Sequence, residues 1–188
     1  MTNFKPQYWL YRNIKFPDLE VANVIKNIKK IGKELIDRDE KLISTFYYKD
    51  FERPDRVFTE RYDEIMQDIV KEQGMFTSTK YLWLFWSQLY FHNGCHPVHN
   101  HATHNDESIK HIKDYKDFVS WVHFIKTPNE KCFRFIDKDG QCYYPEEQNN
   151  GDLIVFPSYL WHEVTPNISK EERFVAAGNI AFTYMDLW

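Results

Sequence analysis

The chain has 188 residues, a formal net charge of −4 and a hydrophobic content of 43%. This length fits one domain with a substantial core, so we expect residues 1–188 to form a single domain. The small negative charge gives no electrostatic basis for binding nucleic acid, and no apolar run approaches the ~18 residues of a membrane span.

The first part of the chain, residues 1–80, reads as mainly helical. Residues 1–17 alternate aromatic and polar side chains and predict an early strand that ends at a proline. Residues 18–36 predict a helix with Asp18 as its N-cap, and residues 59–72 predict a second helix. Apolar residues recur at helical spacing, at Ala22, Ile25, Ile28, Ile31 and Leu35 in the first helix and at Tyr62, Ile65, Ile69 and Val70 in the second.

From residue 80 onward, short aromatic and β-branched runs alternate with turn residues, which is typical of strands. The expected strands are residues 81–91, 96–103, 118–126, 131–136, 141–144 and 152–156, a short run at His162, and residues 173–184. Helices followed by about eight strands predict an α+β domain, a β-sandwich or barrel with helices packed on one sheet. Residues 1–80 would support a β core formed by residues 81–188.

Histidines carry the strongest chemical signal. On a strand, His99 and His101 project to the same face because side chains alternate with a period of two. His162, on a neighbouring strand, would add a third imidazole. Such a set suits Fe(II), Mn(II), Ni(II) or Zn(II). The alternative is a solvated loop, since five of the eight histidines fall between residues 92 and 104.

The segment FPSYLWHEVTPN, followed by EERFVAAGNIAF, resembles the 2-oxoglutarate/Fe(II)-dependent oxygenases. It is most similar to the small prolyl-4-hydroxylase-like members of bacteria and phages. The resemblance covers about residues 81–182 and implies a double-stranded β-helix, a cupin-like jelly roll. It implies that His162 is the distal iron ligand and that Arg173 binds the distal carboxylate of 2-oxoglutarate. A guanidinium in an apolar pocket is the natural bidentate partner of a carboxylate.

Two pairs compete for the proximal iron ligands. His99 and His101 match the His-x-His of the small phage-type members, and we favour them because they lie on the more convincing strand. His104 and Asp106 form a literal His-x-Asp, which would complete a facial triad with His162.

This chain departs from the family at the tyrosine that contacts 2-oxoglutarate. Where the resemblance would place a tyrosine, this chain has His123 and Phe124. Tyr90 is the candidate that would replace this contact.

The resemblance implies a 2-oxoglutarate-dependent dioxygenase that uses Fe(II) and O2 and releases succinate and CO2. Its substrate would be an unactivated C–H bond of a prolyl or other protein side chain, or of a small molecule, and ascorbate would support the activity in vitro. Cupins are the alternative family. They would use His99, His101 and Asp106 in a metal enzyme or binding module that needs neither 2-oxoglutarate nor Arg173.

The compartment follows from the N-terminus and the cysteines. The N-terminus lacks the apolar core of a signal peptide. The three cysteines are odd in number and lack metal-type spacing. We therefore expect a reducing cytoplasm, that of the host if the protein is phage-encoded, with no nucleic-acid or membrane partner.

Overall fold

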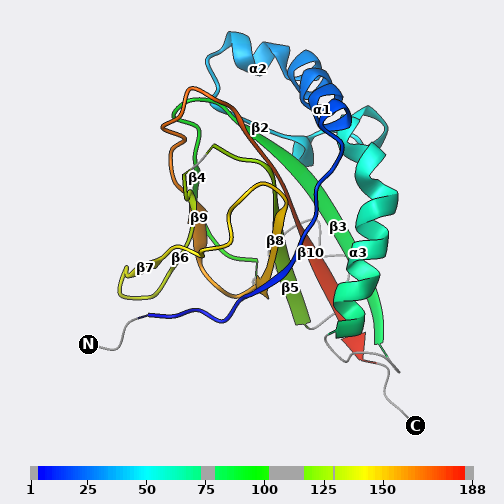
Figure 1. The fold of residues 1–188 in the computed structure, drawn as a ribbon, viewed down its shortest axis with the longest axis vertical. Helices are drawn as coiled ribbons and strands as arrows, with labels where there is room; N and C mark the ends of the chain where they lie inside the picture. Colours follow the sequence, from blue (N-terminus) through cyan, green and yellow to red (C-terminus); the bar gives the residue numbers. More distant parts are fainter. Residues whose placement is uncertain (1–3, 73–78, 102–116, 129, 185–188) are drawn as a thin grey trace.

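A computed structural model describes residues 4–72, 79–101, 117–128 and 130–184. Within these residues, ten strands form two antiparallel sheets (Figure 1). The larger sheet has the order β1 (Trp9–Asn13), β8 (Asp152–Pro157), β5 (Asp117–Lys126), β10 (Arg173–Tyr184), β3 (Thr79–Tyr90) and β2 (Leu42–Ser44). The smaller sheet has the order β4 (His96–His99), β9 (His162–Val164), β6 (Phe133–Ile136) and β7 (Cys142–Tyr143).

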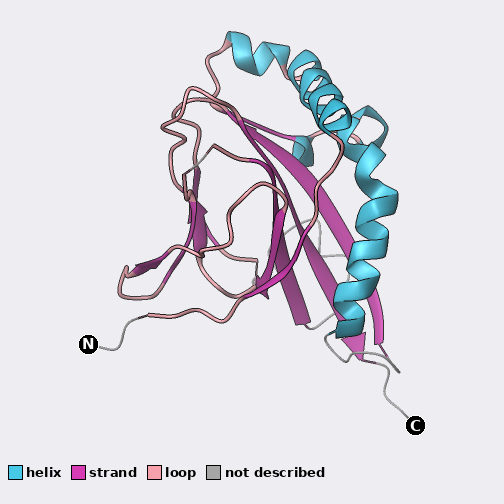
Figure 2. Ribbon diagram, viewed as in Figure 1, coloured by secondary structure: helices cyan, strands magenta, loops and turns pink. Residues whose placement is uncertain are grey.

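The helices lie on the side of the larger sheet that faces away from the smaller sheet (Figure 2). They are α1 (Asp18–Ile31), α2 (Lys33–Asp37) and α3 (Thr59–Glu72), with the 3-10 turns η1 (Thr45–Tyr47), η2 (Asp50–Glu52) and η3 (Pro54–Phe58) between α2 and α3. This arrangement confirms the expected α+β class, with helices packed on one sheet.

The larger sheet separates two apolar cores because its side chains alternate between its faces. One core joins the helices to the outer face of the sheet, and it includes Ile28, Tyr62, Met66, Leu89, Trp121, Phe174 and Ile180. The other fills the space between the sheets, and it includes Tyr90, Val122, Phe124, Phe133, Phe135, Phe156 and Val175. Neighbouring residues of β10, such as Phe174 and Val175, therefore serve opposite cores.

The first predicted helix differs from the structure at both ends. Helix α1 ends at Ile31, and Gly32 separates it from α2. Gly32 packs so closely against Ile43 that an added Cβ would lie 2.6 Å from the side-chain terminus of Ile43. Asp18 is the first helical residue, and Pro17 occupies the cap position without a side-chain hydrogen bond. The prediction of one continuous helix with an Asp18 cap is therefore wrong.

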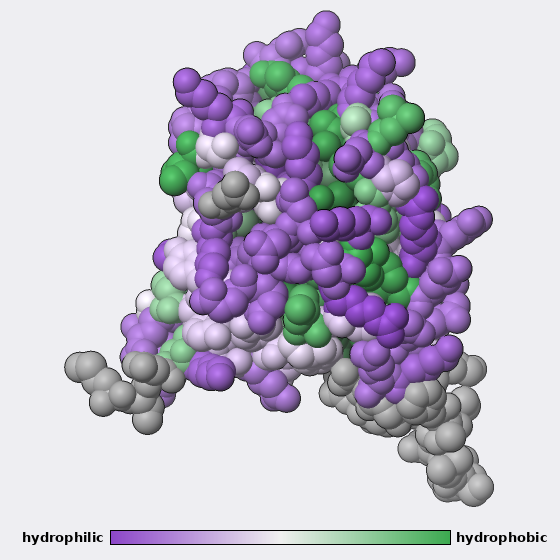
Figure 3. All heavy atoms as spheres, viewed as in Figure 1, coloured by the Kyte–Doolittle hydropathy of each residue, from purple (hydrophilic) through white to green (hydrophobic). Residues whose placement is uncertain are grey.

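The surface is mostly polar on the face shown in Figure 3, where apolar side chains gather in several separate patches among hydrophilic ones. The large apolar side chains are concentrated instead in the two cores. None of the helices in the described ranges is both long and apolar enough to cross a membrane.

His123 belongs to the outer core and not to the space between the sheets. Its Nε2 lies 2.8 Å from the carbonyl oxygen of Ile14, and its Nδ1 lies 2.8 Å from the hydroxyl of Tyr62. A carbonyl can only accept, so Nε2 carries the proton and Nδ1 accepts from Tyr62. Burial lowers the pKa of His123 to about 4. The imidazole thus ties the helices to the sheet in its neutral form.

We predict that acid weakens this tie. In the unfolded chain His123 binds a proton below about pH 6.5, whereas in the folded chain it does so only below about pH 4. Acid between these values therefore favours unfolding. The linked loss of unfolding free energy across that window is about 3 kcal/mol. Denaturant titrations from pH 7 to pH 4 should show a shallower decline for His123→Gln than for wild type. Equal slopes for the two proteins would contradict the assignment.

Candidate active site

His99 and His162 face each other across the smaller sheet. Strands β4 and β9 are antiparallel neighbours, and their register places His99 directly opposite His162, with a register shift between His96 and His99. The two ring centroids are 4.3 Å apart. Sheet pairing therefore brings together two histidines that are 63 positions apart in the sequence.

His101 joins them from outside the strand. Strand β4 ends at His99, so the prediction that it runs to residue 103 is wrong. The backbone N–H of His101 donates to the carbonyl oxygen of Ser158 at 2.8 Å, which anchors the bend to the corner after β8. As a result, one ring nitrogen from each of His99, His101 and His162 lies within 4.8 Å of the others.

Backbone carbonyls orient two of these rings. The Nδ1 of His162 lies 2.8 Å from the carbonyl oxygen of Leu160, and the Nδ1 of His99 lies 2.9 Å from that of Pro97. Because a carbonyl accepts, Nδ1 is the protonated nitrogen and Nε2 keeps its lone pair. A second hydrogen bond of this kind is the usual support of a metal-binding imidazole.

Burial also keeps the imidazoles neutral. Desolvation, with a smaller contribution from the neighbouring histidines, lowers the pKa of His162 well below its ordinary value. Desolvation likewise lowers the pKa of His99. These two rings are therefore ready to act as ligands at neutral pH, without first losing a proton.

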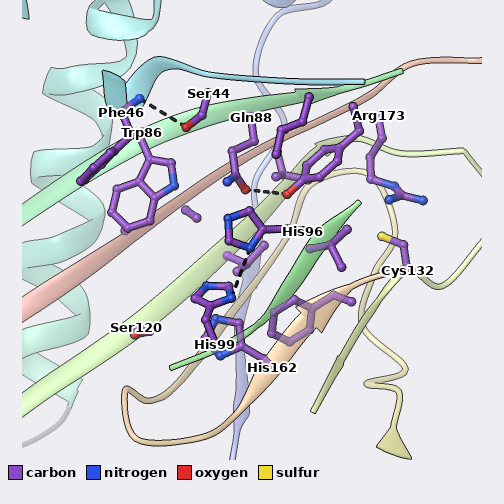
Figure 4. A pocket seen from close by; sticks show the side chains of 18 of the residues that line it. Ser44, Phe46, Trp86, Gln88, His96, His99, Ser120, Cys132, His162 and Arg173 are labelled. Carbon is purple, nitrogen blue, oxygen red and sulfur yellow. Dashed lines mark hydrogen bonds between the residues drawn. The ribbon is translucent and has the colours of Figure 1, made fainter. Parts of the chain in front are cut away.

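The cluster lines a cavity of about 520 Å³ between the two sheets (Figure 4). In that view, Trp86 and Arg173 lie on opposite sides of the histidines. The apolar wall includes Trp86, Tyr90, Val122, Phe124, Phe133, Phe156 and Val175. A mostly apolar cavity with a few polar groups is typical of a small-molecule site.

Arg173 is fully buried in the wall of this cavity. Its Nη2 donates to a carboxylate oxygen of Glu130 at 2.8 Å, and its Nη1 donates to the carbonyl oxygen of Thr165 at 3.3 Å. Its Nε is buried and has no hydrogen-bond partner among the described residues. A buried donor without a partner is costly, so this nitrogen suits an anionic ligand.

Tyr90 pairs with Arg173 across strands β3 and β10. The centre of the Arg173 guanidinium lies 5.7 Å from the Tyr90 ring centroid. The Tyr90 hydroxyl donates to the side-chain oxygen of Gln88 at 2.7 Å. The structure thus places both predicted cosubstrate residues, Arg173 and Tyr90, on one wall of the cavity. Phe124 lines the cavity, but His123 faces the helices.

Several cavity residues were not identified from the sequence. His96 lines the cavity, and its Nδ1 lies 3.2 Å from that of His99. Gln88 lies two residues before Tyr90 on β3 and shares its face, so strand alternation alone could have found it. Phe46 and Tyr47 also line the cavity. They belong to a 3-10 turn in the segment expected to be helical support, and no sequence signal linked that turn to the histidines.

The alternative proximal ligands His104 and Asp106 lie outside the described residues. The structure therefore shows where His99 and His101 lie but does not compare the two pairs.

A buried ion pair positions the 3-10 turns beside the cavity. Asp55 is fully buried, and it accepts from the Nε and Nη2 of Arg53 and from the hydroxyl of Thr45. Arg53 also donates to the carbonyl oxygen of Phe85, at 2.8 Å, on β3. The same group of contacts therefore fixes the turn that carries Phe46 to the larger sheet.

We predict that Asp55→Ala lowers the free energy of unfolding by about 3–5 kcal/mol, because the largely buried Arg53 then keeps only the exposed Asp50 as a counter-charge. The matched control is Asp50→Ala. Asp50 also pairs with Arg53, but its side chain is 72% exposed, so its loss should cost at most about 1 kcal/mol. Chemical denaturation measures both free energies. Equal losses would contradict the claim that the buried Asp55–Arg53 pair contributes more stability than the exposed Asp50–Arg53 pair.

Comparison with known proteins gives a family and a fold. Residues 84–179, a little over half of the chain, match the family model described as "Putative 2OG-Fe(II) oxygenase". No curated protein matches the chain significantly.

Solved structures give the same fold. A prolyl-4-hydroxylase of Pseudomonas putida is 17% identical, with 94% of this chain and 92% of that chain covered and a TM-score of 0.52. The viral collagen prolyl hydroxylase of Paramecium Bursaria Chlorella virus-1, solved with 2-oxoglutarate, is 15% identical, with coverage of 93% and 95% and a TM-score of 0.60. HygX of Streptomyces hygroscopicus, solved with nickel and 2-oxoglutarate, is 11% identical, with coverage of 93% and 82% and a TM-score of 0.54. These similarities confirm the expected double-stranded β-helix.

Proposed function

The chain belongs to the 2-oxoglutarate/Fe(II) oxygenase family, and from this premise we propose that His99, His101 and His162 hold the iron. We propose in addition that Arg173 binds the distal carboxylate of 2-oxoglutarate, with Tyr90 beside it. The observation that carries this proposal is the convergence of three histidine nitrogens within 4.8 Å in a cavity whose wall also contains a fully buried arginine. The family match favours this function over the cupin alternative.

The donor set suits the metal. Imidazole nitrogens bind Fe(II) well, and Nε2 of His99 and of His162 carries the lone pair because Nδ1 of each donates to a backbone carbonyl. Three protein ligands on one side of an ion leave other coordination positions open, as an oxygenase requires. The iron, when bound with 2-oxoglutarate and O2, supplies the oxidising chemistry. The protein holds and orients these groups and excludes water with the apolar cavity wall.

The reaction we propose is hydroxylation of an unactivated C–H bond, coupled to release of succinate and CO2. The substrate would be a prolyl or other protein side chain, or a small molecule. Phe46 and Trp86 would contact it, because they line the cavity on the far side of the histidines from Arg173 in Figure 4. The single domain, with helical support in residues 1–80, and the cytoplasmic location both stay predictions.

We predict that His162→Ala, His99→Ala and His101→Ala each abolish stoichiometric Fe(II) binding, because each removes one of the three proposed ligands. Anaerobic titration with Fe(II) measures the stoichiometry, and circular dichroism checks that the fold survives. His92→Ala is the matched control. His92 is exposed and bonds only to the carbonyl oxygen of Ser169 among the described contacts, so this variant should bind iron normally.

Asp106→Ala separates the two proximal pairs. If His99 and His101 are the ligands, Asp106→Ala binds Fe(II) nearly as tightly as wild type. Full iron occupancy in His99→Ala together with its loss in Asp106→Ala would assign the site to His104, Asp106 and His162 instead.

We predict that Arg173→Ala weakens 2-oxoglutarate binding about ten- to a hundredfold, since a charge-assisted hydrogen bond contributes roughly 1.5–3 kcal/mol. Arg173→Lys should not restore the affinity, because an ammonium lacks the planar fork of a guanidinium. The Kd for 2-oxoglutarate and the turnover to succinate, with Fe(II), O2 and ascorbate, measure the loss. Wild-type affinity in both variants, with metal binding intact, would remove Arg173 from the cosubstrate site.

A further inference from the structure

Glu130 reaches Arg173 from outside the main cavity. Its carboxylate accepts from the Nη2 of Arg173 at 2.8 Å. Glu130 lines a separate surface hollow with Thr127, Lys131 and Glu146, whereas Arg173 lines the main cavity. The Arg173 side chain is fully buried, but that of Glu130 is 20% exposed. A partly exposed carboxylate from the surface hollow therefore pairs with a guanidinium that is buried in the wall of the main cavity.

This contact neutralises Arg173 in the absence of any ligand. A guanidinium keeps its proton in proteins, and a buried charge is stable only beside an opposite charge. Glu130 supplies that charge. The Nη1 of Arg173 donates to Thr165, which leaves the Nε without a partner in the described part of the chain. Arg173 can thus offer a hydrogen bond to an anion, but its net charge is already opposed.

Glu130 supplies the negative charge that balances the formal charges of the proposed site. Three neutral imidazoles bring no negative charge to the metal, whereas a His-x-Asp set brings one carboxylate. Here the carboxylate lies on the guanidinium. With Glu130, the formal charges of a divalent metal, dianionic 2-oxoglutarate, Arg173 and Glu130 cancel. Without Glu130, one positive charge is left uncompensated at Arg173, where a second carboxylate would bind.

We propose that Glu130 is a specificity-determining residue that reduces the preference of the site for a distal carboxylate on the 2-oxo acid. This inference rests on the proposed role of Arg173. The carboxylate of Glu130 repels the like charge that Arg173 attracts. A 2-oxo acid of the same length without the second carboxylate, such as 2-oxopentanoate, is not repelled in this way. Wild type therefore discriminates between the two acids less than the buried arginine alone would.

Glu130→Gln tests the proposal, because glutamine keeps an oxygen for Arg173 but removes the charge. Isothermal titration of the Mn(II)-loaded protein gives the Kd of 2-oxoglutarate and of 2-oxopentanoate. We expect the ratio of the 2-oxopentanoate Kd to the 2-oxoglutarate Kd to rise about tenfold, ~1.4 kcal/mol, mainly through tighter binding of 2-oxoglutarate. An unchanged or lower ratio would overturn the proposal.

Glu146→Gln is the matched control. Glu146 lines the same hollow and pairs with Lys131, so the variant removes an equal charge without touching Arg173, and it should keep the wild-type ratio. An equal rise in Glu146→Gln would mean that general surface charge sets the ratio, which also refutes the proposal.

Two further variants complete the test. Should Glu130→Gln fail to fold, Glu130→Asp withdraws the carboxylate from Arg173, and its ratio should rise by a smaller factor; no rise overturns the proposal. Arg173→Ala should bring the ratio close to one. If Arg173→Ala keeps the wild-type ratio, the proposed role of Arg173 fails and this inference fails with it. If only the Glu130 variants are neutral, the role of Arg173 stands alone.

Discussion

The pairing of β3 with β10 is the constraint on which the site depends. Twelve consecutive residue pairs join the two strands, from Arg173 opposite Tyr90 to Tyr184 opposite Thr79. A slip of β10 by one residue would turn every side chain of that strand to the opposite face. Arg173 would then point into the helical core and Phe174 into the cavity, while Tyr90 and Leu89 of β3 would keep their sides. The helices enforce the register, because burying Phe174 and Leu89 against them leaves Arg173 on the cavity side.

The site combines a buried charge with neutral imidazoles. Desolvation keeps His99 and His162 uncharged, and backbone carbonyls fix which nitrogen of each ring bears the proton. The opposite strategy holds at Arg173, where the charge is kept and a carboxylate opposes it. The smaller sheet thus provides neutral imidazole nitrogens. The larger sheet provides the Arg173 cation, whose attraction for an anion depends on its pairing with Glu130. A dianionic cosubstrate that chelates a metal at one end would fit between them.

Much of this architecture could be predicted from the sequence because strand and helix periods are local. Helix α3 and strand β10 have the predicted bounds, and β6 and β7 fall within the expected strands 131–136 and 141–144 and pair as a hairpin, with Gly140 between them at a positive φ of 79°. The resemblance placed His162 and Arg173 in one site. The helical periodicity runs through Gly32 and so did not reveal the break there, and the close packing of Gly32 against Ile43 involves a different element.

The rest depends on contacts between distant segments that no local pattern reports. His101 was expected on a strand, but a hydrogen bond from its backbone to Ser158 positions it instead. Glu130 is 43 residues from Arg173, and in sequence it is one acidic residue among 28. Asp55 reads as a turn residue, yet it is fully buried and organises the 3-10 segment beside the cavity.

A crystal structure of the protein with Mn(II) and 2-oxoglutarate would test the central claim most directly. The account predicts one ion bound by the Nε2 atoms of His99 and His162 and by a ring nitrogen of His101, with no carboxylate side chain in the coordination sphere and with the distal carboxylate of 2-oxoglutarate on Arg173. An ion bound by His104 and the carboxylate of Asp106 would contradict it.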